Sequence, residues 1–195
     1  MRIIVGVTGA SGTAYGYRLI EKLRRNPDVE THLILTRAAE RTAHIECGKS
    51  SAEFKALADY THPVEDIGSR LASGSFLTDG MVIAPCSIHS MSAIAAGISS
   101  NLLIRAADVC LKERRKLILL VRESPLHLGH LRTMAALTEM GAIIAPPTPG
   151  FYNHPQTVMD LIDHSIDRVL DLLHLPAPDA RRWDGVGRPR RDQSE

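Results

Sequence analysis

Aromatic residues are scarce in this chain, and long hydrophobic runs are absent. Phe, Trp and Tyr make up only 4% of the 195 residues. The core must therefore consist mainly of aliphatic side chains, which suits a buried parallel sheet between helices better than a β-sandwich. The longest apolar run, at residues 117–121, is far too short to span a bilayer, so we expect no membrane segment.

Charge and cysteine usage narrow the class further. Lys and Arg number 23 against 22 Asp and Glu, so the net charge is +1 and no basic excess predicts a nucleic-acid partner. Cys47, Cys86 and Cys110 are an odd number without a CxxC pair, which argues against a disulfide framework or a zinc knuckle. We see no charged leader followed by an apolar stretch, so we expect no secretion signal and a reducing, cytoplasmic compartment.

Continuous aliphatic runs alternate with helical periodicity over most of the chain. Runs typical of strands covered on both faces lie at 3–7, 32–36, 81–85, 117–122 and 142–146. Helices are expected at 15–24, 38–46, 90–98, 101–113, 128–140 and 156–173. The alternation predicts a three-layer α/β/α fold with a parallel sheet, flavodoxin-like or Rossmann-like, and five strands suggest the order 2-1-3-4-5.

The chain is long enough for one domain with a full core, which we place at residues 1–175. From Pro176 the sequence turns to Pro-Ala-Pro and then to a basic stretch. This composition predicts a C-terminal tail at 176–195, either mobile or a packing arm. The stretch 59–78 is long and poorly periodic and contains the small-residue segment 72–76. It is either a functional loop or an ordinary surface connection.

The first predicted strand ends in a loop of small residues. Gly9-Ala10-Ser11-Gly12 follows that strand and leads into a helix, so backbone N–H groups and the helix N-terminus are placed to face an anion. The loop has neither the Gly-Lys-Ser/Thr of a Walker A motif nor the GxGxxG of a dinucleotide site. It is therefore either a phosphate cradle or a tight strand-to-helix turn.

Polar residues also follow the other predicted strands. Thr36 ends the second strand, and Ser87 follows the third. Because the carboxyl ends of parallel strands meet at one edge, these hydroxyls and the small-residue loop predict a site for a nucleotide monophosphate or a flavin. Arg122 and Glu123 end the fourth strand. They are either a surface ion pair or engaged by a ligand, with Glu123 as a general acid.

Histidine and cysteine motifs add little chemistry. His127 and His130 lie three residues apart, but no further ligand stands at metal spacing, so no metal site is predicted. Cys86 precedes a predicted helix start, where a thiolate is stabilised, yet no histidine partner is placed for it. A small buried cysteine is favoured over a nucleophile.

Motifs along nearly the whole chain carry a family resemblance. The segments concerned are 6–12, 72–76, 80–87, 105–109, 111–115, 121–127 and 151–152. Together they resemble the flavin prenyltransferase family (UbiX-type), the partners of the ubiquinone- and phenolic-acid-type decarboxylases. Only the tail of about 20 residues, of low-complexity character, falls outside.

The resemblance implies an enzyme that transfers a dimethylallyl group from dimethylallyl phosphate to N5 and C6 of reduced FMN. The product, prenylated FMN, would serve a UbiD-type decarboxylase. The family also implies that no metal is needed and that the protein is a large homo-oligomer, a dodecamer, with some site residues crossing between subunits. By resemblance, FMN is held by Gly9, Ala10, Ser11, Thr36, Ser87, Ile88, His89, Ser90 and Arg122.

By the same resemblance, Tyr152, Arg168, Lys112 and Glu123 bind the allyl phosphate, and Glu123, Ser11 and Lys112 are the catalytic residues. Two cations and the tyrosine hydroxyl would stabilise charge on the leaving phosphate. Glu123 would protonate that phosphate and help to remove the flavin's proton. Ser11 is placed near both the flavin and the allyl phosphate.

Two positions depart from the family pattern, and two other functions remain open. His89 stands where many relatives have Lys, and Thr36 where Ser is common, but neither change removes a proposed catalytic group. The first alternative is a carrier subunit that binds FMN or prenylated FMN for an aromatic acid decarboxylase with little catalysis of its own. The second is a flavodoxin-like electron carrier. The presence of Lys112, Glu123, Tyr152 and Arg168 argues against a carrier, which would not need all four. The near-neutral net charge and the scarcity of aromatic residues argue against an electron carrier.

Overall fold

The structure is a computed structural model, which describes residues 1–183 and 185. The chain forms two compact units, one over residues 1–147 and one that begins at Thr148. The end of the predicted tail, residues 184 and 186–195, lies outside the described residues.

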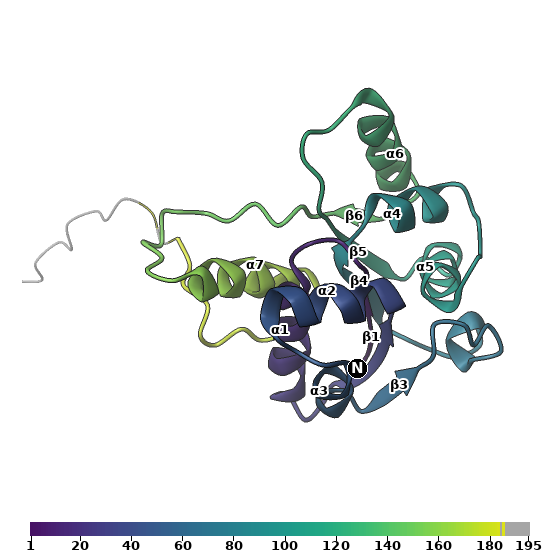
Figure 1. Ribbon diagram of the computed structural model, residues 1–195, viewed down its shortest axis with the longest axis horizontal. Coiled ribbons are helices and arrows are strands. Elements are labelled where there is room, and N and C mark those ends of the chain that lie inside the picture. Colours follow the sequence, from purple (N-terminus) through teal and green to yellow (C-terminus); the bar gives the residue numbers. More distant parts are fainter. Residues whose placement is uncertain (184, 186–195) are drawn as a thin grey trace, which may run out of the picture. The chain divides into compact units, whose positions relative to one another are not determined.

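The first unit is built on a parallel six-stranded sheet (Figure 1). Its strands are β1 (Arg2–Val7), β2 (Glu30–Leu35), β3 (Tyr60–His62), β4 (Gly80–Cys86), β5 (Lys116–Val121) and β6 (Ile143–Ile144). They lie in the order β3-β2-β1-β4-β5-β6. The strand β4 is buried along its whole length, which explains why its sequence is continuously apolar rather than alternating.

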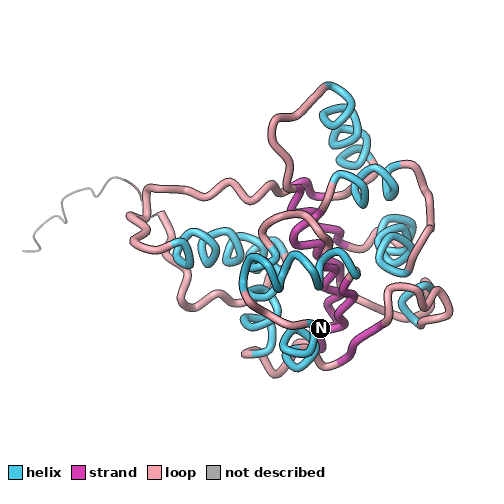
Figure 2. Tube along the Cα trace, in the orientation of Figure 1, coloured by secondary structure: helices cyan, strands magenta, loops and turns pink. Residues whose placement is uncertain are grey.

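Helices cover both faces of this sheet (Figure 2). They are α1 (Thr13–Arg24), α2 (Arg37–Cys47), α3 (Ser51–Leu57), α4 (Ile88–Ala95), α5 (Leu102–Lys112) and α6 (Leu128–Glu139), with a 3-10 helix η1 at Arg70–Ala72. Helix α1 packs on β1, β2 and β4, whereas α5 packs on β4 and β5. Met81 and Ile83 of β4 join the core cluster that contains Leu103 of α5. Val82, between them, is fully buried and points to the other face of the sheet.

The predicted three-layer fold and strand order are confirmed, with one additional strand at the edge. The structure adds α3, β3 and η1 between residues 51 and 72, where no element was expected. Helix α3 has only seven residues, and β3 has three, two of them exposed. Segments this short and exposed do not show the hydrophobic periodicity on which the prediction depends.

The second unit contains the helix α7 (Val158–Leu172). The chain after α7 folds back onto this unit, because Arg182 forms two hydrogen bonds with the carboxylate of Asp171, at 2.6 and 2.9 Å. The Asn153 side chain also donates to the carbonyl of Arg181 at 2.9 Å. Hydrogen bonds thus tie the described part of the predicted tail to this unit. Across the residues that the structure describes, no helix is both long and apolar enough to cross a membrane.

Candidate active site

A cavity of about 550 Å³ opens where β1, β2, β4 and β5 end. Parallel α/β sheets hold their ligands at this edge, and ligand pockets commonly measure roughly 300–1,000 Å³. The residues that line it are Thr8, Gly9, Ala10, Ser11, Thr36, Ala38, Ser87, Ile88, His89, Ser90, Asn101, Arg122 and Glu123. All the residues that were expected to hold FMN therefore lie around one cavity.

The ends of β1 and β4 are tied together by Thr8, a buried residue that was not among the predicted site residues. Its hydroxyl donates to the carbonyl of Pro85 at 2.8 Å and accepts from the N–H of Ser87 at 2.9 Å. Beside it, Gly9 approaches α2 so closely that a Cβ atom would overlap the side chain of Ala38. The small-residue loop is therefore fixed on both sides, and its approach to α2 requires glycine.

Thr36 and Ser87 cap the two helices that begin at the cavity. Thr36 Oγ1 accepts from the N–H of Ala39 at 3.1 Å at the start of α2, and Ser87 Oγ accepts from the N–H of Ser90 at 3.3 Å at the start of α4. Ser87 Oγ also donates to the Ser90 hydroxyl at 3.2 Å. These caps hold both hydroxyl groups in place at helix N-termini, whose partial positive charge favours a bound phosphate.

The N-terminus of α1 is engaged by a carboxylate of the protein itself. Glu46, near the end of α2, accepts hydrogen bonds from the N–H groups of Gly12 and Thr13 at 2.9 and 3.1 Å. Burial raises the pKa of Glu46, but these bonds and one from the Ser11 side chain outweigh burial, so the pKa lies below its ordinary value. The loop was expected to present this helix end to a ligand anion. Instead, Glu46 neutralises the helix end and holds Ser11.

Arg122 and Glu123 are both exposed where β5 ends. The N–H of Arg122 donates to the carbonyl of Cys86 at 3.0 Å, which extends the pairing of β5 with β4. Glu123 Oε1 accepts from the N–H of Ser124 at 2.9 Å. Within the described residues no ion pair joins Arg122 to Glu123. The alternative expectation, that the two side chains form a surface ion pair, is therefore not met.

Lys112 does not line this cavity. It is the last residue of α5 and forms an ion pair with Glu113, which holds the pKa of that carboxyl below its ordinary value. The pair lies against Gly74, where a Cβ atom would overlap the Glu113 carboxylate. Within one chain, the cavity therefore contains two of the three predicted catalytic residues, Ser11 and Glu123, and not the third.

Tyr152 and Arg168, the other expected phosphate ligands, lie in the second unit. The Tyr152 hydroxyl is 2.9 Å from His164 Nε2, and Arg168 donates to Asp171 at 2.7 Å. His164 and Arg168 are one helical turn apart, so they share a face of α7. Tyr152 is 45% exposed and the Arg168 side chain 62%, which leaves both open to a ligand.

Cys86 is the last residue of β4 and is fully buried, and burial raises the pKa of its thiol to about 12. A thiol that stays protonated is a poor nucleophile, so the structural interpretation of Cys86 is confirmed. The rings of His127 and His130 stack with their centroids 3.5 Å apart. In the part of the chain that the structure describes, no group of three or more potential ligands is arranged around a metal site.

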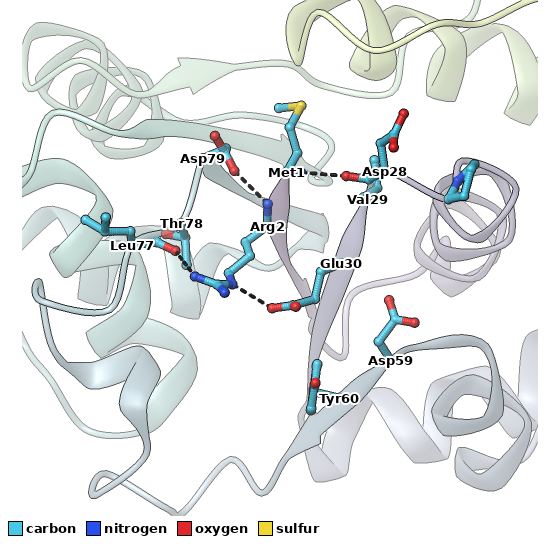
Figure 3. A pocket seen from close by; sticks show the side chains of 11 residues that line it. Met1, Arg2, Asp28, Val29, Glu30, Asp59, Tyr60, Leu77, Thr78 and Asp79 are labelled. Atoms are coloured by element: carbon cyan, nitrogen blue, oxygen red, sulfur yellow. Dashed lines mark hydrogen bonds and ion pairs between the residues drawn. The ribbon is translucent and has the colours of Figure 1, made fainter.

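A second large cavity, of about 570 Å³, lies at the opposite edge of the sheet, where the strands begin (Figure 3). Arg2 joins its walls, because its side chain donates to Glu30 at 2.6 Å and to the carbonyl of Leu77 at 3.2 Å. Its backbone N–H donates to Asp79 at 2.6 Å. Figure 3 shows that Arg2 links Glu30, Leu77 and Asp79 across the strand starts. Because residues of the walls at the strand starts bind one another, the cavity at the carboxyl edge is the better candidate for the ligand site.

Comparisons with known proteins decide the family. The family model described as Flavoprotein matches residues 1–167. A probable UbiX-like flavin prenyltransferase from Streptomyces sp. (strain D7) is 54% identical over 186 residues, which cover 95% of this chain and 93% of the relative. The chain belongs to the flavin prenyltransferase family. The resemblance inferred from the motifs is thereby confirmed.

Two solved structures of UbiX-type proteins match closely. One is a dodecameric FMN-dependent UbiX-like decarboxylase from Escherichia coli O157:H7, with a TM-score of 0.93 and 48% identity over 95% of this chain and 100% of that chain. The other is AnUbiX (PadA1) in complex with FMN and dimethylallyl pyrophosphate, with a TM-score of 0.93 and 45% identity over 95% and 98%. Both agree with the flavodoxin-like fold of this family member.

Proposed function

We propose that this protein is a metal-independent flavin prenyltransferase that joins the dimethylallyl group of dimethylallyl phosphate to N5 and C6 of reduced FMN. Phosphate leaves, and prenylated FMN is the product. The observation that carries the proposal is the cavity at the carboxyl edge, in which the FMN-binding motifs of the family converge in a chain 54% identical to a probable flavin prenyltransferase. A UbiD-type decarboxylase then uses prenylated FMN as its cofactor. We place the reaction in the cytoplasm.

The cavity fits a flavin mononucleotide in charge and shape. The starts of α2 and α4, with the hydroxyls of Thr36 and Ser87, suit the phosphate group. Arg122 adds the cation of this cavity wall, and the glycine at position 9 lets the backbone pass close to α2. When bound and reduced, the flavin supplies the electron-rich nitrogen and carbon that accept the prenyl group. The chain supplies binding, orientation and proton transfer.

Ser11 and Glu123 are the protein groups that act at the reacting end of the cavity. Glu123 is held by the N–H of Ser124 at 2.9 Å, so its other carboxylate oxygen is the one that delivers a proton to the leaving phosphate. The same carboxylate then accepts the proton that the flavin loses during ring closure. Ser11, whose hydroxyl donates to the Glu46 carboxylate, contributes an oxygen that accepts a hydrogen bond.

The prenyl donor is held by its phosphate. Tyr152 and Arg168 are exposed in the second unit and offer a hydroxyl and a guanidinium, and Lys112 offers an ammonium. Positive charge and hydroxyl donors stabilise the negative charge that grows on the phosphate as the allylic C–O bond breaks. This requirement separates an enzyme from a carrier, which would need to bind only the flavin.

The direct test is an anaerobic incubation of the protein with reduced FMN and dimethylallyl phosphate, followed by mass spectrometry and absorption spectroscopy of the flavin. We expect the prenylated flavin as product, with turnover that is insensitive to a chelator. A parallel reaction with dimethylallyl pyrophosphate shows which donor is used. If FMN binds but neither donor yields prenylated flavin, the carrier function replaces the enzymatic one.

A further inference from the structure

His164 contacts Tyr152, one of the proposed ligands of the prenyl donor. Its Nε2 atom lies 2.9 Å from the Tyr152 hydroxyl, within the second unit. The two rings meet edge to face, with centroids 5.4 Å apart and planes at 84°. No part of the proposed mechanism uses this histidine, and its motif was not among those that carried the family resemblance.

Close packing holds the two rings in this arrangement. Gly150 lies so near that a Cβ atom there would be 2.7 Å from the Tyr152 ring and 3.2 Å from His164. On another side, Trp183 meets the Tyr152 ring with centroids 5.7 Å apart and planes at 80°. The tyrosine ring therefore contacts Gly150, His164 and Trp183, although the residue as a whole is 45% exposed.

The protonation pattern of His164 follows from its second ring nitrogen. His164 Nδ1 is buried and has no hydrogen-bond partner among the residues that the structure describes. A buried N–H without an acceptor costs more than a buried lone pair without a donor. The neutral ring therefore carries its proton on Nε2, and this N–H donates to the oxygen of Tyr152.

This direction of the hydrogen bond determines what Tyr152 can do. Because the oxygen of Tyr152 accepts from His164, the hydroxyl proton is not used within the pair and can point to an external acceptor. With the opposite tautomer, the Tyr152 hydroxyl would donate its proton to His164 Nε2 and would have none left for a ligand. A phosphate oxygen, which only accepts hydrogen bonds when ionised, matches the first arrangement and not the second.

We infer that His164 is a positioning residue of the prenyl-donor site, which turns the Tyr152 hydroxyl proton toward the phosphate of an allylic monophosphate. This inference rests on the proposed function, because it takes Tyr152 as a donor ligand. His164 does not itself touch the substrate. Arg168, one turn further along the same face of α7, supplies charge to the same phosphate.

The test compares two replacements of His164. His164→Leu keeps the bulk but removes the donor, whereas His164→Gln retains an N–H group that can reach Tyr152. We measure KM and kcat for dimethylallyl phosphate with reduced FMN, and the Kd of the same donor in the unreactive complex with oxidised FMN by calorimetry. His164→Leu should raise both KM and Kd about fivefold, the effect of one lost hydrogen bond. It should also lower kcat, because the Tyr152 hydroxyl stabilises the charge that grows on the leaving phosphate. His164→Gln should restore wild-type values.

A double-mutant cycle with Tyr152→Phe makes the test specific. Once the tyrosine hydroxyl is gone, His164→Leu should have no further effect on Kd, because it acts only through that hydroxyl. His44→Leu, on the exposed side of α2, serves as the control and should change nothing.

Equal Kd values for wild type and His164→Leu, or fully additive effects with Tyr152→Phe, would overturn the positioning role. If His164→Leu does not fold, the comparison of His164→Gln with Tyr152→Phe decides the question: a Gln variant as weak as the Phe variant contradicts the inference. Failure of the proposed function has a different signature, because the wild-type protein itself would then form no prenylated flavin.

Discussion

Glu123 is the residue on which the proposed proton transfers depend. It lies in the cavity at the end of β5, and the N–H of Ser124 fixes one of its oxygens. Glu123→Gln keeps this hydrogen bond and the size of the side chain but cannot release or accept a proton. We therefore expect unchanged binding of FMN, with kcat lowered about 100-fold or more, the typical contribution of a general acid.

Flavin fluorescence quenching gives the FMN affinity, and single-turnover kinetics give the rate of prenylation. Glu139→Gln, at the exposed end of α6, is the matched control and should behave like wild type. Turnover of Glu123→Gln within twofold of wild type would refute the acid role while leaving the flavin site in place.

Single residues also show where sequence reasoning ends. The hydroxyl and glycine residues of the cavity were predictable, because each directly follows a strand and parallel strand ends meet at one edge. The role of Glu46 was not predictable. It accepts a hydrogen bond from the N–H of Gly12, which lies 34 residues away in the sequence, and its own neighbours form an ordinary helix. Only the fold brings its carboxylate to the N-terminus of α1.

At the scale of elements, a hydrogen-bonded chain of side chains joins the strand starts β1 and β2 to β3 and η1. Arg2 donates to Glu30 at 2.6 Å, and Glu30 lies 2.8 Å from His32 Nε2. His32 Nδ1 lies 3.0 Å from His62 Nε2, and His62 Nδ1 lies 2.9 Å from the hydroxyl of Ser69, the cap of η1. The Glu30 carboxylate only accepts, so the neutral His32 ring donates to it from Nε2. His32 Nδ1 then accepts from His62 Nε2, and His62 Nδ1 accepts from the Ser69 hydroxyl.

The same chain makes stability depend on pH. Burial lowers the pKa of both His32 and His62, although Glu30 opposes this at His32 and Asp66 at His62, while Arg2 and Arg70 add to it. The unfolded chain therefore binds protons below pH 6.5 more readily than the folded one. The free energy of unfolding should fall as the pH is lowered from 6.5 towards 5.

His62→Gln tests this dependence, because the amide can still donate to His32 and accept from Ser69 but does not titrate. In urea unfolding at fixed protein concentration, the variant should lose less stability between pH 6.5 and 5 than wild type does. His44→Gln, on the exposed side of α2, should leave the slope as it is. Identical slopes for His62→Gln and wild type would contradict the assignment of the pH effect to this pair.

Elements differ in how far the sequence predicts them. The strands β1, β2, β4 and β5 have five or more buried residues each and were found within two residues of their ends. By contrast, β3 is held by its pairing with β2 and by the hydrogen bond between His32 and His62. Both contacts join residues about 30 positions apart in the sequence. Such long-range contacts have no counterpart in local periodicity.

At the scale of the whole molecule, the position of Lys112 has a consequence for assembly. Ser11 and Glu123 line the cavity of the first unit, but Lys112 lies outside it, at the end of α5. A relative with a TM-score of 0.93 is described as dodecameric. If Lys112 acts on the prenyl donor, as we propose, we expect a neighbouring copy of the chain to contribute it in a symmetric homo-oligomer.

Mixed oligomers decide whether the site is shared between copies. Co-expression of Lys112→Ala and Glu123→Gln chains gives oligomers in which every chain carries one defect. With a shared site, about a quarter of the cavities receive an intact Glu123 and an intact Lys112 from a neighbour, since each has an even chance. Activity should then return to about that fraction of wild type. Ser11→Ala mixed with Glu123→Gln is the control: both residues belong to one cavity of one chain, so no activity should return. A Lys112 mixture as inactive as this control would show that the lysine of a neighbour does not complete the site.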